Sequence, residues 1–342
     1  MCRQSLMTKM SLILLAVLGV IITACGGASS SGSGSSGSTQ VAAVIKGLDN
    51  PFFQAMQRGI QDEAGTVGVS VTVQAATSIT DTTGQADKLQ ALAGQNYGCY
   101  IVNPISGTNL VQALAPISQA GKPIINIDNP ISTQAAQAAG IKISTYIGTD
   151  NVSAGQQAAN EMAKLLPTGG KVALIGGIAG DVTSQQRLQG FSQGIPATIQ
   201  IVQTVAADWD RQKALTAAGD ILRAHPDLKG FFVANDDMAL GVVRAIADAG
   251  KQGQVKVVSV DGIQDALKSI QAGQLSATVS QYPYTIGAMG VEACKAALAG
   301  KTLPTKVTAP VLVVTSDNVA QALASFPKPF SSYVDPFQDL LK

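Results

Sequence analysis

The sequence predicts an α/β protein built from two doubly wound parallel sheets, and three observations indicate this fold class. From Val41 onward, short β-branched runs alternate with Ala-rich stretches of helical length. Most of these runs are almost continuously apolar, which is typical of strands buried on both faces of a parallel sheet. Helix-capping residues stand where the helices should begin. With 342 residues, the chain is long enough to fold as two Rossmann-like lobes.

The individual elements follow from this alternation. The runs predicted as strands are 41–45, 69–73, 99–102, 123–127, 143–147, 171–175, 199–205, 230–233, 255–260 and 275–280. The stretches between them fit crossover helices. Asn50-Pro51 predicts a helix start, because a capping residue precedes proline at the first helical position, and Asp150-Asn151 and Asn235-Asp236 predict two more. After Ser316, three prolines exclude one continuous helix to the end of the chain.

Composition excludes several functions. The 23 Lys and Arg balance 22 Asp and Glu, so the basic surface that nucleic-acid binding requires is missing. Hydrophobic residues make up 46% of the chain and charged residues 13%, which excludes intrinsic disorder. The single histidine, His225, excludes a His-rich zinc site and is interpreted as a solvated loop residue. We therefore predict no metal and no cofactor.

The N-terminus is predicted to export and anchor the chain. An apolar run over 12–22 is too short to cross a bilayer and is typical of a signal-peptide core. It ends in Ile22-Thr23-Ala24-Cys25, which resembles the lipobox of bacterial lipoproteins and implies lipidation of Cys25. Residues 1–24 are therefore the predicted signal peptide. Residues 25–40 combine the lipidated cysteine with a Gly/Ser tether, which places the protein on the extracytoplasmic face of a membrane, in the periplasm or at the cell surface.

Two cysteines lie in the folded body. Cys99 falls in a strand-like run and Cys294 in a helix-like stretch. An exported location permits a disulfide between them. We expect two buried free thiols instead.

Polar side chains follow many of the predicted strands. A ligand of an open parallel sheet binds beyond the carboxyl ends of the strands, and the residues there are rich in Asp, Asn and Gln, with no obvious nucleophile. Such groups suit a ligand with many hydroxyls, although each one could instead cap a helix. Phe52, Phe53 and the single tryptophan, Trp209, stand beside them and offer faces on which a sugar ring can stack, with a core role as the alternative for the two phenylalanines.

Eight motifs along the chain point to a particular protein family. They are Asn50-Pro51-Phe52-Phe53, Asn103-Pro104, Asn126-Ile127-Asp128, Arg187-Leu188-Gln189-Gly190-Phe191, Ala207-Asp208-Trp209-Asp210, Asn235-Asp236-Asp237-Met238-Ala239-Leu240-Gly241, Val260-Asp261-Gly262 and Gln281-Tyr282-Pro283. Together they resemble the ribose-type sugar-binding proteins of bacterial ABC importers, whose type I periplasmic binding fold is shared with the sensor domains of the lactose-repressor family. The resemblance covers residues 41 to about 315.

The resemblance implies two lobes joined by a three-segment hinge. The crossovers are expected near 148–150, 281–283 and 308–310. The N-terminal lobe would then contain residues 41–148 and 283–309, and the C-terminal lobe residues 149–282 and 310–342.

The resemblance also implies a ligand site between the lobes. The family's ligand residues fall on Asn50, Phe52, Phe53, Asn103 and Asp128 in the first lobe and on Arg187, Trp209, Asn235 and Asp261 in the second, with Gln281 at the hinge. The two Asp residues should accept hydrogen bonds from hydroxyls, Arg187 should donate them, and the aromatic residues should stack on the ligand.

Two positions depart from the family pattern and are included in the predicted site. Ribose binders usually carry Arg directly after the Asp that matches Asp128, whereas this chain has Asn129. They carry a small polar residue where this chain has Lys46. We therefore expect a ligand other than ribose: a pyranose, a polyol or a cyclitol.

The function that follows is solute capture by a monomeric, non-enzymatic lipoprotein that delivers its ligand to an ABC permease. One alternative is a lipid-anchored sugar sensor for a membrane signalling partner. Another is a carbohydrate-active enzyme that uses a carboxylate pair from Asp236, Asp237 and Asp261. The glycine cluster at 176–180 lacks the Lys and Ser/Thr of a phosphate-binding loop and is interpreted as a tight turn.

Overall fold

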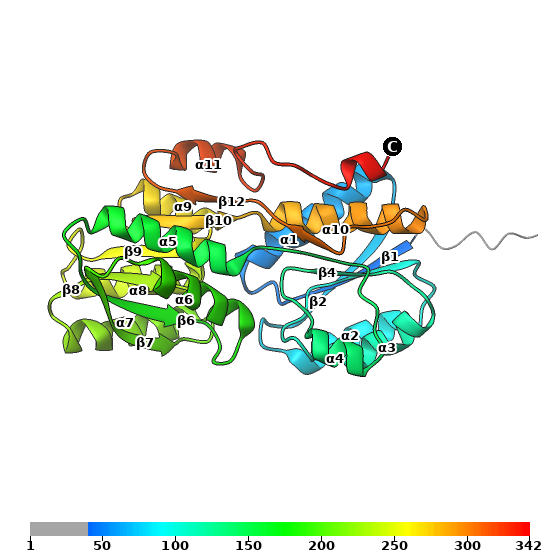
Figure 1. Cartoon of the computed structure of the whole chain (residues 1–342), viewed down its shortest axis with the longest axis horizontal. Coiled ribbons are helices and arrows are strands. Elements are labelled where there is room, and N and C mark those ends of the chain that lie inside the picture. The colour runs from blue at the N-terminus through cyan, green and yellow to red at the C-terminus, as the bar shows by residue number, and fades with distance from the viewer. Residues whose placement is uncertain (1–39) are drawn as a thin grey trace, which may run out of the picture. The chain divides into compact units, whose positions relative to one another are not determined.

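The computed structural model describes residues 40–342. The predicted signal peptide, the predicted lipidation site Cys25 and the tether up to residue 39 lie outside the described residues. The described chain forms two lobes, each with its own six-stranded sheet (Figure 1).

In the first lobe the strand order is β11-β5-β4-β3-β1-β2, and every pair is parallel. Its elements are β1 (Gln40–Ile45), α1 (Pro51–Val67), β2 (Ser70–Ala75), α2 (Thr82–Ala93), β3 (Cys99–Val102), α3 (Val111–Gln119), β4 (Ile124–Ile127), α4 (Thr133–Ala138), β5 (Thr145–Gly148), α10 (Pro283–Leu298) and β11 (Lys306–Thr308).

In the second lobe the strand order is β12-β10-β9-β8-β6-β7, with only the β10–β12 pair antiparallel. Its elements are α5 (Asn151–Leu165), β6 (Gly170–Gly176), α6 (Val182–Gly194), β7 (Ile199–Ala206), α7 (Arg211–Ala224), β8 (Leu228–Val233), α8 (Asp236–Asp248), β9 (Lys256–Asp261), α9 (Gln264–Gln271), β10 (Ala277–Gln281), β12 (Val311–Val314) and α11 (Val319–Ser325).

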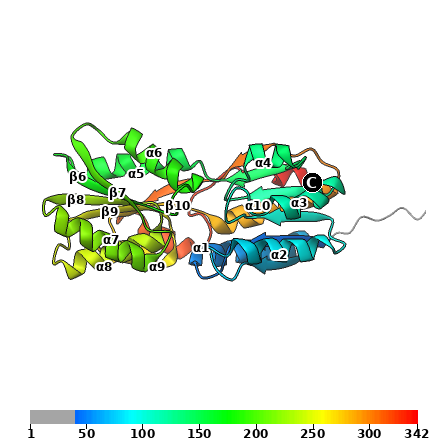
Figure 2. The same ribbon diagram turned by 90° about the horizontal axis from the view of Figure 1, so that it is seen from below.

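Both sheets are covered on both faces, as the continuous apolar runs predicted. In β1, alternate side chains pack against α1 and α10 on one face and against α2 and α3 on the other. In β8, Phe231 joins the core under α7, α8 and α9, while Phe232 stacks on Phe191 of α6 with ring centroids 4.3 Å apart. Figure 2 shows α5 and α6 on one side of the second sheet and α7, α8 and α9 on the other.

All ten predicted strands are present, with ends that agree within two residues. The three predicted helix starts are also confirmed, because Asn50, Asp150 and Asn235 each accept a hydrogen bond from a backbone amide of the first turn. Strands β11 and β12 were not predicted from the sequence. β11 is a three-residue edge strand with one buried residue, so it carries almost no apolar signal.

The chain passes between the two sheets three times. The passages lie between β5 and α5, between β10 and α10, and between β11 and β12. They fall at the predicted crossovers, so the three-segment hinge is confirmed.

The expectation of two free thiols is wrong. Cys99 of β3 and Cys294 of α10 form a disulfide, with their Cα atoms 5.7 Å apart. The two residues are separated by 195 positions in the chain, but α10 lies against β3 and β4 in the first lobe. Helix α10 returns to this lobe from the second one, so only the tertiary fold brings the sulfurs together.

The end of the chain corrects the predicted lobe assignment of residues 310–342. Strand β12 and α11 belong to the second lobe, where α11 packs on α9. Beyond α11 the chain runs back to α10 of the first lobe, where Phe337 is fully buried and Gln338 donates a hydrogen bond to Glu292 (Figure 1). As the three prolines predicted, no continuous helix forms here: α11 is followed only by a short 3₁₀ helix over Gln338–Leu340. Across residues 40–342, no helix has both the length and the apolar character needed to cross a membrane.

Candidate functional site

A cavity lies between the two lobes, at the carboxyl ends of the strands of both sheets. The first lobe lines it with Lys46, Asn50, Phe52, Phe53, Ile79, Ile105 and Asp128, and the second with Ile178, Thr183, Arg187, Trp209, Asn235 and Asp261. Its charged lining groups are two carboxylates and two cations, which balance formally.

The backbone is strained at this cavity. Within residues 40–342, the non-glycine residues with positive φ are Asp128, Asp208, Trp209 and Asp261, with φ of 59°, 53°, 62° and 138°. Three of these four line the cavity. Left-handed conformations cost energy for residues with a side chain and tend to persist at functional sites, where the surrounding structure enforces them. The strain therefore marks the cavity as a site rather than a packing defect.

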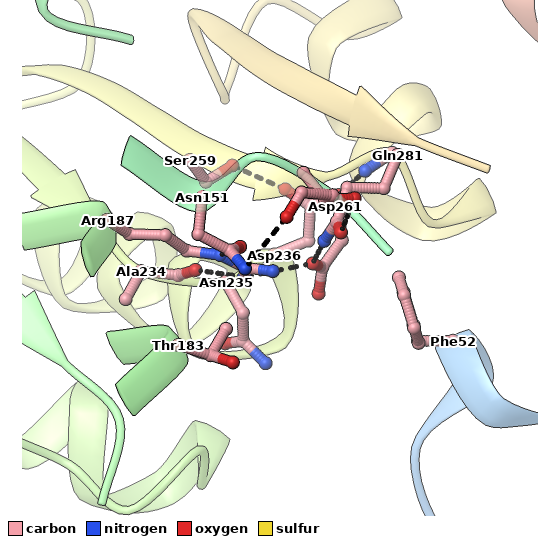
Figure 3. A network of polar contacts seen from close by, with 12 residues as sticks. Phe52, Asn151, Thr183, Arg187, Ala234, Asn235, Asp236, Ser259, Asp261 and Gln281 are labelled. Carbon is pink, nitrogen blue, oxygen red and sulfur yellow. Dashed lines mark hydrogen bonds and ion pairs between the residues drawn. The ribbon is translucent and has the colours of Figure 1, made fainter. Parts of the chain in front are cut away.

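Arg187 is the centre of the second lobe's half of the site. It projects from α6 and is 4% exposed. Its Nε donates to Asn151 Oδ1 at 2.8 Å, and its Nη1 donates to the Ala234 carbonyl at 2.7 Å and to Asp261 Oδ1 at 3.2 Å (Figure 3). Three acceptors thus fix the guanidinium, which leaves Nη2 for a ligand.

Asp261 ends β9 and connects the site to the hinge. Its Oδ1 also accepts a hydrogen bond from Gln281 Nε2 at 2.7 Å, and Gln281 Oε1 accepts one from Thr149 Oγ1 at 2.6 Å. Thr149 and Gln281 stand at two of the three hinge passages. Arg187 Nη1 and Gln281 Nε2 both donate to Asp261 Oδ1, so Asp261 Oδ2 is left for a ligand. Burial raises the pKa of Asp261 to about 8, and the neighbouring Arg187 cation opposes that rise.

Asp236 anchors the backbone that carries Asp261. It is fully buried at the start of α8. Its Oδ2 accepts from the amides of Gly262 and Ile263 at 2.6 and 2.9 Å, and its Oδ1 accepts from Ser259 Oγ at 2.5 Å and Thr278 Oγ1 at 2.7 Å (Figure 3). Burial raises the pKa of Asp236 to about 6, and these four hydrogen bonds act against that shift. The strained turn after β9 is therefore held by a residue that does not line the cavity.

Asp128 provides the carboxyl group on the first lobe's side of the cavity. Its backbone is fixed after β4, because its amide donates to the Ile147 carbonyl at 2.8 Å and its carbonyl accepts from Tyr146 Oη at 2.6 Å. Burial raises the pKa of Asp128, while Lys46, Arg187 and a hydrogen bond from Asn103 lower it. The Asp128 carboxyl is half-buried and has few hydrogen-bond partners, so it can accept hydrogen bonds from a ligand.

Aromatic rings complete the lining. Phe52 and Phe53 from the first turn of α1 meet edge to face, with centroids 5.2 Å apart, and Lys46 Nζ lies 5.4 Å from the Phe53 centroid. Trp209 lies 5.9 Å from the Arg187 guanidinium. It packs so closely on Gly177 that a Cβ there would come within 2.1 Å of the indole. The absence of a side chain at Gly177 therefore makes room for the Trp209 indole. A hydrogen bond from the Gly177 amide to Ser184 Oγ fixes the turn from β6 into α6.

The structure gathers nine of the twelve predicted site residues around this cavity, Lys46 among them. Asn103, Asn129 and Gln281 do not line it. Asn103 forms a hydrogen bond with the side chain of Asp128, and Gln281 donates one to Asp261. The side-chain amide of Asn129 donates to the carbonyls of Pro104 and Ile105.

Four lining residues were not predicted from the sequence: Ile79, Ile105, Ile178 and Thr183. Three are apolar loop residues, which a search for polar groups at strand ends does not find. Thr183 had a weak signal, because it stands in the first turn of the helix that follows the predicted glycine turn at 176–180.

Within residues 40–342, no three His, Cys, Asp or Glu side chains are grouped so as to hold a metal ion. The charged groups of the site pair with each other or face the cavity. The arrangement is suited to holding a small uncharged molecule through many hydrogen bonds.

Two sheets joined by three passages, with a polar cavity between them, define a two-lobed solute-binding protein. Residues 41–302 match the family model of the periplasmic binding protein domain. The chain belongs to this family, which is a solute-binding family and not an enzyme family.

Named relatives agree with this assignment. The chain is 39% identical to the D-allose-binding periplasmic protein of Escherichia coli, over 78% of this chain and 86% of the relative. It is 33% identical to the ribose import binding protein RbsB of Bacillus subtilis, over 90% and 99% of the two chains. A solved ABC transporter solute-binding protein from Actinobacillus succinogenes with bound D-allose superposes with a TM-score of 0.79 at 30% identity, covering 82% of this chain and 99% of that one.

Proposed function

We propose that this protein captures a neutral aldopyranose in the cavity between its lobes and delivers it to an ABC importer. The observation that carries the proposal is the combination of groups in the lining: Asp128 faces the cavity from one lobe, Asp261 and Arg187 face it from the other, and aromatic rings stand beside them. Carboxylates accept from sugar hydroxyls, the guanidinium donates to them, and the rings pack on the apolar faces of a pyranose.

The stereochemistry of the sugars for which the relatives are named narrows the class of sugar that we propose as the ligand. The pyranose forms of D-allose and D-ribose have the same configuration at C2, C3 and C4, and allose adds a hydroxymethyl group at C5. Relatives named for either sugar match this chain over most of its length. We propose D-allose as the preferred ligand, with D-ribose weaker, because the apolar lining of Ile79, Ile105 and Ile178 offers contacts to the additional carbon.

The proposal also concerns where the protein works. Cleavage after Ala24 and lipidation of Cys25 would tether it to the extracytoplasmic face of the membrane, as a monomer that meets its permease there. Mass spectrometry of the protein from its native host tests this part. An unmodified Cys25 or a retained Met1 would disprove the anchor without affecting the sugar site.

The ligand is tested with a panel of sugars that differ at one centre. Titration calorimetry should give one-to-one binding of D-allose, with D-glucose, its C3 epimer, at least about 100-fold weaker, because an epimer leaves buried polar groups unpaired. D-altrose and D-gulose test C2 and C4, and myo-inositol and D-allonate test the cyclitol and sugar-acid classes. Tight binding of myo-inositol or D-allonate with no binding of any aldose would overturn the proposal.

A further inference from the structure

The side chain of Asn129 is used in an unexpected way. It follows Asp128 directly but points away from the cavity and is 2% exposed. Its Nδ2 donates to the carbonyls of Pro104 and Ile105 at 3.0 and 3.1 Å, and its backbone amide donates to Asn103 Oδ1 at 3.4 Å. Asn129 is therefore fixed rigidly on the first lobe.

Its remaining acceptor reaches the other lobe. Asn129 Oδ1 accepts a hydrogen bond from Thr183 Oγ1 at 3.2 Å. Thr183 stands in the first turn of α6, the helix that also carries Arg187. This hydrogen bond joins the loop after β4, which positions Asp128, to the helix that positions Arg187.

The surroundings favour this hydrogen bond. Ile105 and Ile178, one from each lobe, line both the ligand cavity and a neighbouring groove that also contains Asn129. The hydrogen bond is half-buried and Asn129 itself is only 2% exposed, so little water competes for its side-chain oxygen. The other partners of Asn129 all lie on its own lobe, so the contact to Thr183 is the one that opening of the lobes would break.

We propose that Asn129 and Thr183 form a closing contact that stabilises the closed form and sets how long the sugar stays bound. This rests on the proposed function only in assuming that a ligand closes the lobes. An interaction made only in the closed form shifts the opening equilibrium and slows dissociation without a direct bond to the ligand. A single neutral hydrogen bond of this kind is worth about a 2- to 12-fold change in dissociation rate.

The first test compares two variants of Thr183. Thr183→Val keeps the shape and removes the hydroxyl, whereas Thr183→Ser keeps the hydroxyl. With D-allose and D-ribose as probes and Trp209 emission in stopped flow, Thr183→Val should dissociate about 2- to 12-fold faster with an unchanged association rate. Thr183→Ser should stay near wild type. Thr66→Val is the matched control, because Thr66 is bonded only within its own exposed helical turn.

A double-mutant cycle separates the closing contact from direct contact with the sugar. Thr183 lines the cavity and Asn129 does not. If Thr183 acts through Asn129, Thr183→Val should have no further effect on dissociation in an Asn129→Ala background. If Thr183 acts on the sugar alone, the two effects multiply and the proposal is wrong.

A ligand-free measurement keeps the test independent of the sugar. Spin labels at Lys142→Cys and Lys229→Cys, one exposed position on each lobe, report the distance between the lobes when Cys2 and Cys25 are replaced by Ser. Thr183→Val should reduce the closed fraction of the free protein, and Thr183→Ser should restore it. If no sugar binds the wild type, the proposed function fails while this result still decides the closing contact. A Thr183→Val protein with wild-type closed fraction and wild-type dissociation rates would overturn the inference.

Discussion

The two lobes hold their halves of the cavity in different ways. In the second lobe, Arg187 has three acceptors, Asp261 two side-chain donors and Asp236 four donors, and all of these partners belong to the same lobe or to the hinge. In the first lobe, the Asp128 carboxyl has only the Asn103 amide, and most of the remaining lining is aromatic or aliphatic.

This difference indicates a division of labour. The second lobe presents a preorganised polar surface, because each group is oriented before a ligand arrives. The first lobe supplies apolar contact and one carboxylate that gains its partners from the ligand. Changes in the second lobe should therefore spread through the network, whereas changes in the first lobe should stay local.

Loss of Arg187 should have the largest effect. Arg187→Met removes a ligand donor and leaves Asp261 buried without its cation, which costs about 3–5 kcal/mol, or roughly 100- to 5,000-fold in affinity. The melting temperature should also fall, because three acceptors lose their donor. Calorimetry and thermal unfolding measure both effects. Arg211→Met is the control, since Arg211 pairs with Asp237 at the exposed surface. A loss no larger than that of an Asp128 variant would contradict the contrast.

Asp236 should matter although it does not touch the cavity. Asp236→Ala removes the acceptor for two amides and two hydroxyls, so we expect a loss of about 2–3 kcal/mol in stability and roughly 10- to 100-fold weaker sugar binding. Asp236→Asn should be milder. Its oxygen can keep the two amides while its nitrogen donates to Ser259 and Thr278.

The neighbouring residue supplies the control for this prediction. Asp237→Ala removes a carboxylate at the next position, but its partner Arg211 is exposed, so affinity should not change. Equal effects of Asp236→Ala and Asp237→Ala would show that the turn after β9 does not depend on its buried anchor.

Asp128 should show the opposite pattern in the first lobe. Asp128→Asn should weaken sugar binding by about 1.5–3 kcal/mol, roughly 10- to 100-fold, because hydroxyls lose a charged acceptor. The ligand-free melting temperature should stay unchanged or rise, since burial already disfavours the charged carboxyl. Asp87→Asn, at an exposed position of α2, is the control. A clear fall in ligand-free stability would show that Asp128 is held by a network after all.

The pH dependence should come mainly from Asp261. Burial raises the pKa of Asp261 from 3.8 to about 8, and a sugar hydroxyl that donates to the carboxylate favours the ionised form. Affinity should therefore rise by less than about tenfold per pH unit as pH increases towards 8, and then level off.

The stability of the free protein should change in the opposite direction. The contribution of Asp261 to the free energy of unfolding is fully present below about pH 4 and is lost as the pH rises through 8. Between these values the folded state retains a proton that the unfolded state has released. Calorimetry in buffers of different ionisation enthalpy should detect proton release on binding. Asp261→Asn should abolish that release, and an unchanged release would assign it to another group.

The fold could be predicted because most of its strands are buried on both faces, so their apolar runs identified them in the sequence. The short edge strand β11, with one buried residue, carried none. Part of the site could be predicted because the carboxyl ends of parallel strands converge, which brings Asp128 and Asp261 together from distant segments. Arg187 lies within α6, so its place in the site was predicted from the family resemblance alone.

Side-chain direction could not be predicted in the same way. Asn129 turns away from the cavity because two carbonyls of the loop after β3 claim its amide. Nothing in the local sequence indicates that competition. The partner of Cys99 was hidden for a related reason, because α10 reaches it only after the chain has passed through the second lobe.

The disulfide should have the smallest effect on the sugar and a large effect on stability. It joins β3 to α10 inside the first lobe, and neither cysteine lines the cavity. Closing a loop between residues 195 positions apart restricts the unfolded chain, so reduction or Cys99→Ala/Cys294→Ala should cost about 3–5 kcal/mol of unfolding free energy. Affinity for D-allose should stay within about twofold at temperatures where the protein remains folded. Urea titrations with and without reductant measure the stability difference, and the double variant, which reductant should not destabilise further, is the control. A tenfold loss of affinity on reduction would mean that the first lobe's half of the site depends on a remote link as much as the second lobe's half depends on Asp236, and the contrast between the lobes would then fail.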